Sequence, residues 1–221
     1  NGDELSRLAA ELSEESRRKN EFLATLAHEL RNPLSPIKNA VQLMSLMEVS
    51  DEVEDLRATM ERQVEQIVRL LDDLMDISRI GRGKIELKNQ VVEVATILDT
   101  AVEASRLQIE SNQQHLSVTV ANQGLCVDVD PSRITQVVSN LLNNASKYSD
   151  VECQIDLSAE QIDDQIVICV RDNGSGISPE RIEDIFEMFS QVEDSVERGT
   201  AGLGIGLTLV RTLVELHGGA I

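Results

Sequence analysis

Basic side chains are scarce in this sequence of 221 residues. Lysine and arginine number 20 against 39 aspartates and glutamates, which gives a formal net charge of -19. A surface with that balance repels phosphate backbones and anionic headgroups, so nucleic acid and a membrane surface are excluded as expected partners. Long apolar runs are also missing, because none reaches the ~18 residues of a membrane-spanning helix, and no signal peptide opens the chain. We therefore expect a soluble, cytoplasmic segment without direct membrane contact. A membrane anchor of the full-length protein remains open, and it would lie outside this sequence.

Cysteine is similarly sparse. Cys126, Cys153 and Cys169 are odd in number, lack metal-ligand spacing and lie in runs with β-strand character. We interpret them as small, buried apolar residues of a protein in a reducing compartment.

The first third of the chain carries the apolar pattern of packed helices. A heptad frame with Glu15 and Lys19 as interruptions begins after Asp3, which suits a signalling coiled coil over 1–20 and is also common in purely structural helices. The frame holds Leu5, Leu8, Leu12, Phe22 and Leu26. The first helix is expected to continue to about Met47, before a turn at 48–51. A second stripe consists of Val53, Leu56, Met60, Val64, Ile67, Leu71 and Leu74, and it is ended by Gly81 and Gly83.

Two long amphipathic helices joined by a short loop predict a helical hairpin over 21–82. A single hairpin leaves each apolar stripe half covered, so we infer a homodimer in which two hairpins form a four-helix bundle.

His28 lies outside the apolar stripe of the first helix. Phe22, Leu23, Leu26 and Leu30 fall within an arc of about 100°, and the histidine points roughly opposite. Glu29 follows it directly, and Pro33 cannot donate the helical hydrogen bond to the Glu29 carbonyl, so a bend is expected one turn beyond the histidine. The residues predict an accessible imidazole beside a carboxylate, although an isolated exposed histidine on a helix is usually only a surface residue.

After Gly83 the pattern changes to mixed strands and helices. We predict strands over 85–92, 116–120, 125–130, 152–157 and 165–171, and helices over 96–111, 131–148 and 205–216. The absence of a regular βαβ repeat favours an α+β fold, a two-layer α/β sandwich over 83–221, rather than a doubly wound sheet.

The helix that begins at Pro131 carries a polar ridge. Asn140, Asn144 and Lys147 lie within about 60° of one another, and the adjoining apolar stripe holds Ile134, Val137, Val138, Leu141 and Ala145. A carboxamide oxygen is a suitable ligand for Mg2+, and a lysine one turn later suits phosphate. The alternative is a set of polar residues on a solvated face.

Glycines are concentrated near the C-terminal end of the sequence. The run Asp172-Asn173-Gly174-Ser175-Gly176 follows an apolar strand, so the backbone can approach a flat ligand while a buried carboxylate accepts from an adenine amine. The same run is common in ordinary turns. Gly202-Leu203-Gly204-Ile205-Gly206 opens the last helix and places amides where phosphates can bind. The spacing fits neither a Rossmann fingerprint nor a Walker A loop.

Taken together, these blocks resemble the catalytic core of sensor histidine kinases. Residues 28–34 match the phosphoacceptor pattern His-Glu-Leu-Arg-(Thr or Asn)-Pro-Leu. Downstream, 140–148 is similar to the N box of the ATP-binding domain, 172–176 to its G1 box, 186–189 to its F box and 202–206 to its G2 box. The resemblance implies a Bergerat (GHKL) sandwich that binds ATP and Mg2+, with 180–200 as a lid and its flank. The family's sandwich normally continues beyond His217-Gly218-Gly219 with a β hairpin, which this sequence does not include. Two explanations remain open, a shortened domain or residues missing from the sequence, and a truly shortened domain would have an incomplete sheet.

The resemblance also implies a role for each matching residue. His28 accepts the phosphoryl group, Glu29 is the candidate to accept or orient the ring proton, and Asn32 matches the position linked to phosphatase activity. Asn144 holds Mg2+ and Asp172 reads adenine. The other implied nucleotide-binding residues are Asn140, Lys147, Tyr148, Gly174, Gly176, Gly202, Leu203, Gly204 and Gly206.

The implied partners are a second copy of the chain, a response-regulator receiver domain that takes the phosphoryl group, and an upstream sensor domain. Two other functions remain open from the residues: a GHKL-type ATPase without phosphohistidine chemistry, and a non-catalytic dimeric scaffold. His115 and His217 are expected to be structural or solvated.

Overall fold

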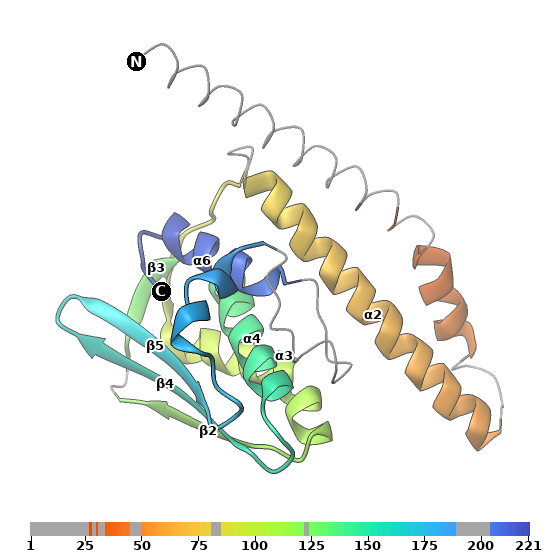
Figure 1. The fold of residues 1–221 in the computed structure, drawn as a ribbon. Coiled ribbons are helices and arrows are strands. Elements are labelled where there is room, and N and C mark those ends of the chain that lie inside the picture. The colour runs from red at the N-terminus through yellow and green to blue at the C-terminus, as the bar shows by residue number, and fades with distance from the viewer. Residues whose placement is uncertain are drawn as a thin grey trace. The chain divides into compact units, whose positions relative to one another are not determined.

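The computed structural model describes residues 27, 30, 34–44, 50–80, 85–121, 124–188 and 204–221, and the chain divides into two units, Asn1–Ile85 and Glu86–Ile221 (Figure 1). The predictions for His28, Glu29, Asn32, Gly202 and Leu203 fall outside the described residues, as do the heptads of 1–20 and the bend at Pro33.

The first unit is helical where it is described. Residues 34–44 are α-helical, and α2 spans Asp51–Ile80, which confirms the predicted second helix. The C-terminal part of the α2 stripe is buried at Leu71 and Leu74, whereas Leu56 and Ile67 are 64% and 42% exposed. No described helix is long and apolar enough to cross a membrane.

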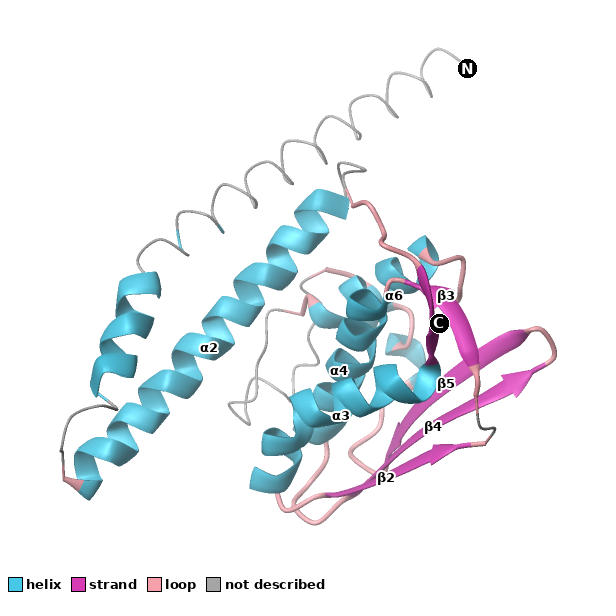
Figure 2. Cartoon of the chain, turned by 180° about the vertical axis from the view of Figure 1, so that it is seen from behind, coloured by secondary structure: helices cyan, strands magenta, loops and turns pink. Residues whose placement is uncertain are grey.

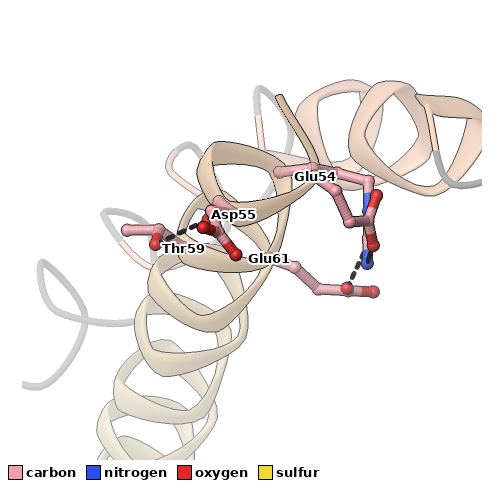
Figure 3. A network of polar contacts seen from close by, with 5 residues as sticks. Glu54, Asp55, Thr59 and Glu61 are labelled. Atoms are coloured by element: carbon pink, nitrogen blue, oxygen red, sulfur yellow. Dashed lines mark hydrogen bonds and ion pairs between the residues drawn. The ribbon is translucent and has the colours of Figure 1, made fainter. Parts of the chain in front are cut away.

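A cluster of charged residues stabilises the start of α2 (Figure 3). Arg57 donates to both carboxylate oxygens of Glu54, at 2.9 and 2.7 Å, and to Glu61 at 2.6 Å, while the Thr59 hydroxyl donates to the Asp55 carbonyl at 2.9 Å. The hydrogen bonds to Glu54 and Glu61 raise the pKa of Arg57, and the same contact with Arg57 lowers the pKa of Glu54. These pairs at i,i+3 and i,i+4 support the first turns of the helix.

The second unit has a layer of strands and a layer of helices (Figure 2). Strands β2 (His115–Val120), β4 (Gln154–Ile162) and β5 (Gln165–Asp172) form a sheet in the order β2-β4-β5. The β2–β4 pair is parallel and the β4–β5 pair antiparallel. A separate antiparallel pair joins β1 (Gln90–Glu93) to β3 (Cys126–Val129). These strands confirm the α+β class.

The helical layer consists of α3 (Val94–Ser111), α4 (Pro131–Tyr148) and α6 (Gly206–Leu216); α3 and α4 pack on the three-stranded sheet, and α6 packs against α4. The core lies between the layers, where Leu98 of α3 and Leu142 of α4 pack with Ile155 and Leu157 of β4. Leu142 is fully buried and Leu141 is not, so the predicted apolar stripe was wrong at this position by one residue.

The first predicted strand was too long. Residues 85–89 have no regular structure, and only Gln90–Glu93 pair with β3. The backbone N–H of Lys88 donates to the Asp130 carboxylate at 3.0 Å, so this amide is used by a side chain rather than by a strand partner.

The burial predicted for the cysteines was also wrong. Cys126 and Cys169 are exposed and Cys153 is half-buried. Cys169 pairs across the sheet with Ser158, whereas the next residue, Val170, pairs with the buried Leu157. Because side chains alternate along a strand, Cys169 belongs to the face away from the helices.

Candidate nucleotide site

Helix α4 begins at a strong N-cap. Asp130 Oδ1 accepts from the backbone N–H groups of Ser132 and Arg133 at 3.1 and 3.3 Å, and Pro131 occupies the first helical position. Burial disfavours the charged carboxylate, but hydrogen bonds from the N–H groups of Lys88, Arg133 and Ser132 outweigh it, and the pKa of Asp130 is lowered from 3.8. The cap therefore fixes the helix that carries the polar ridge.

His217 also contacts this N-cap, through the backbone of Asp130. Its Nε2 accepts from the Asp130 backbone N–H at 3.1 Å, so Nδ1 carries the proton and donates to the Leu213 carbonyl at 2.7 Å. The expected structural role of His217 is confirmed. His115, at the start of β2, is exposed.

The C-terminal half of α4 carries the predicted ridge. Asn140, Asn144 and Lys147 are half-buried, and Tyr148 is exposed. Asn140 Nδ2 is buried and has no hydrogen-bond partner among the described residues. An orphaned donor of this kind fits an acceptor supplied by a bound ligand. The Lys147 ammonium lies 4.9 Å from the centre of the Tyr148 ring, so a cation and an aromatic face adjoin at this end of the helix.

The loop after β5 rests on the end of α4. The Ser175 backbone N–H donates to the Tyr148 carbonyl at 3.3 Å, and the Ser175 hydroxyl reaches the same oxygen at 3.4 Å. Asn173 Oδ1 accepts from the Gln154 backbone N–H at 3.1 Å, which ties the loop to β4 as well. The structure thus brings the predicted Asp172–Gly176 block and the predicted Asn140–Tyr148 block together.

Gly174 is required by close packing. A methyl group at this position would lie 2.5 Å from the Tyr148 carbonyl oxygen, 2.8 Å from the Ser149 hydroxyl oxygen and 2.9 Å from Asp172 Oδ1. Gly176 has a φ of +70°, a left-handed conformation that favours glycine, and open space around it. Two glycines of one motif are therefore needed for different physical reasons.

Asp172 differs from its prediction, because the residue is exposed rather than buried. Its Oδ1 accepts from the Gly174 backbone N–H at 2.9 Å. That bond orients the carboxylate at the surface of the loop and leaves Oδ2 to accept from a ligand.

The start of α6 provides backbone donors. The helix has no side-chain cap at Ile205, and Gly204 has a φ of +65°. Uncapped N–H groups at a helix N-terminus are suited to bind phosphate. Sequence reasoning missed Arg211, whose guanidinium lies 4.1 Å from the centre of the Phe186 ring and connects α6 to the short helix η2 (Asp184–Phe186). Nothing local in the sequence pairs these two residues.

The donor set also fits a magnesium ion that arrives with a nucleotide. No group of three or more His, Cys, Asp or Glu side chains that could hold a metal occurs in the described part of the chain. A carboxamide oxygen such as that of Asn144 is chemically suited to bind Mg2+, and the phosphates of a nucleotide would supply further oxygen ligands.

Family profiles identify the class of protein to which this glycine loop and asparagine-bearing helix belong. The profile of histidine kinase-, DNA gyrase B-, and HSP90-like ATPases matches residues 129–221, and the profile of the His Kinase A (phospho-acceptor) domain matches residues 18–83. The chain therefore carries a His Kinase A phosphoacceptor domain and a histidine kinase-, DNA gyrase B-, and HSP90-like ATPase domain, the two parts of a sensor histidine kinase catalytic core.

Individual relatives agree with this assignment. The chain is 31% identical over 99% of its length to "Sensor protein GacS" of Pseudomonas syringae pv. syringae, and 26% identical over 92% of its length to "Sensor protein SrrB" of Staphylococcus aureus. It covers 25% and 35% of these proteins, about a quarter to a third of each. The solved structure of full-length ShkA in complex with AMPPNP superposes with a TM-score of 0.71 at 26% identity, over 90% of this chain and 41% of that one.

Proposed function

We propose that this chain is the autophosphorylating core of a two-component sensor kinase. The ATPase unit holds ATP, and the imidazole of His28 attacks the γ-phosphorus. A nitrogen–phosphorus bond forms, the bond to the β,γ-bridging oxygen breaks, and ADP leaves. The observation that supports this proposal best is the presence of a phosphoacceptor domain and a nucleotide-type site in one chain, with the end of α4 and the Asp172–Gly176 loop held together by Ser175.

Each predicted residue has a defined task in this reaction. Asp172 accepts a hydrogen bond from the adenine amine, while Lys147 and the amides at the start of α6 hold the phosphates. Asn144 offers its carboxamide oxygen to Mg2+, which, when bound, offsets the charge of the phosphates. Asn140, through its orphaned amide, donates to a phosphate or to a water beside it.

The hairpin supplies the acceptor. Glu29 accepts or orients the proton of the His28 ring, since the neutral imidazole is the nucleophile. The phosphoryl group then passes to an aspartate of a response-regulator receiver domain. An upstream sensor domain controls the reaction, which takes place in the cytoplasm, where ATP is available.

Isotope labelling tests the central step. With ATP labelled at the γ-phosphate, the full chain is expected to acquire an acid-labile, base-stable label that His28→Gln abolishes. Replacing the exposed His115 by glutamine is the matched control and should leave the label unchanged. Asn144→Ala should lower both ATP binding and labelling. ATP hydrolysis without any label would instead support the ATPase alternative, and a parent chain that binds no ATP would support the scaffold.

A second activity, dephosphorylation of the partner, follows from the position of Asn32 one turn after His28. We expect Asn32→Ala to slow loss of phosphate from a phosphorylated receiver domain while self-labelling continues. An unchanged dephosphorylation rate would remove the support for this activity.

A further inference from the structure

The C-terminal end of α4 is capped by residues from distant parts of the chain. A helix leaves its last carbonyls without intrahelical partners, and a glycine in the left-handed conformation often satisfies them. Here Ser149 follows the helix in an extended conformation instead, with φ of -104° and ψ of 151°. The carbonyl oxygens at this end must therefore find other donors.

Gln114 donates to one of these helix carbonyls and to the two carbonyls that follow the helix. This residue lies just before β2, is 7% exposed, and directs Nε2 at the carbonyl oxygens of Ser146, Asp150 and Ser149, at 2.9, 3.2 and 3.4 Å. Asn112 assists by donating to the Ser146 hydroxyl at 3.0 Å. An amide nitrogen has only two hydrogens, so the three oxygens share them, and the amide can take only the orientation in which nitrogen faces the carbonyls.

The same backbone segment supports the Asp172–Gly176 loop. The Tyr148 carbonyl, which Gln114 leaves free, accepts from the Ser175 N–H, and the Ser149 hydroxyl lies in close contact with the space beside Gly174. Gly174 in turn holds Asp172 through the 2.9 Å bond to Oδ1. A continuous set of contacts thus runs from Gln114, through residues 146–150, to the carboxylate of Asp172.

We infer that Gln114 is a positioning residue for base recognition: by fixing the end of α4, it places the Asp172 loop so that the carboxylate meets the exocyclic amine of adenine. This inference rests on the proposed function, because it assigns Gln114 to the selectivity of the same nucleotide site. Gln114 itself touches no substrate.

The test is a ratio of affinities in the full chain. ATP and ITP differ at the position that Asp172 is proposed to read, where ITP carries an oxygen in place of the amine. We measure the Kd of each by competition with a fluorescent nucleotide, in the wild type and in Gln114→Glu. The variant replaces the donor by a carboxylate of the same shape that faces three carbonyl oxygens. We expect the preference for ATP over ITP to fall about tenfold.

Partial unfolding lowers the affinities for ATP and ITP by the same factor, and this factor cancels in their ratio. Loss of stability alone therefore does not produce the expected result. Gln114→Met removes the donors without adding charge and should also reduce the preference. Gln113→Glu, the same change at the exposed neighbour, should not. If the wild type prefers ATP and both Gln114 variants keep the same ratio of affinities, the inference about Gln114 is wrong and the proposed function still stands. A wild type that binds neither nucleotide overturns the proposed function instead.

Discussion

At the scale of single residues, Gly174 is the most tightly packed of the glycines described, so its substitution gives a clear prediction for stability. Gly174→Ala would press a methyl group into the Tyr148 carbonyl oxygen at 2.5 Å, and backbone cannot move aside as a flexible side chain can. We expect the change to destabilise the ATPase unit by about 1–3 kcal/mol and to weaken ATP binding. Gly206→Ala, with nothing within 4 Å, should not lower the melting temperature. Equal melting temperatures for the two variants would contradict the packing argument.

Asp130 gives the protein a defined response to acid. Because its folded-state pKa lies below 3.8, the carboxylate contributes stability that is present above pH 3.8 and is lost as the pH falls through the folded-state pKa. The Asp130→Asn variant would retain an acceptor for the cap but no charge. Urea unfolding of the wild type and of this variant should therefore differ most at neutral pH and converge below pH 3.8. A difference that is constant with pH would contradict this assignment.

At the scale of secondary-structure elements, α2 predicts the oligomeric state. Leu56 and Ile67 belong to one apolar stripe yet remain exposed in the single chain, which suits a helix that packs against a second copy. Ile67→Glu should convert a dimer into a monomer in light scattering, since a carboxylate would be buried at the interface. Gln63→Glu, on an exposed position of the same helix, is the matched control and should leave the mass unchanged. A dimeric Ile67→Glu variant would place the interface elsewhere.

Elements whose ends are marked by nearby residues, such as a capping side chain or a proline, were predicted well from the sequence. The helix at 131–148 begins after an aspartate cap, with a proline in its first position, and it ends where the apolar pattern of the sequence ends. The structure gives the same bounds. The strand expected from Ile85 failed because Asp130, distant in sequence, takes the Lys88 amide. The family resemblance assigned both Asp172 and Tyr148 to nucleotide binding. The Gln114 contacts had no signal in the sequence, because their partners lie 32–36 residues away.

At the scale of the whole molecule, the described contacts of the nucleotide site lie within one unit. Ser175, Tyr148, Asp172 and Gln114 all belong to Glu86–Ile221. A fragment of residues 86–221 should therefore bind an ATP analogue with a Kd within about threefold of the full chain, about 0.6 kcal/mol, and acquire no label of its own. As the control, a separate hairpin fragment that contains His28 is added to this fragment, and labelling should return. Self-labelling of the fragment would rule out His28 as its acceptor.

Both ends of α4 are held by residues far away along the chain: Lys88 and His217 at the start, Gln114 and Ser175 at the finish. On the ribosome, the helix emerges long before His217 does, so its first turn lacks the contact with this histidine until residue 217 has been translated. A nascent chain halted at Asp172 would already contain every asparagine of the ridge and still be unable to retain nucleotide. We expect competence for ATP to arise late in synthesis and abruptly, as a property of the finished unit rather than of any segment within it.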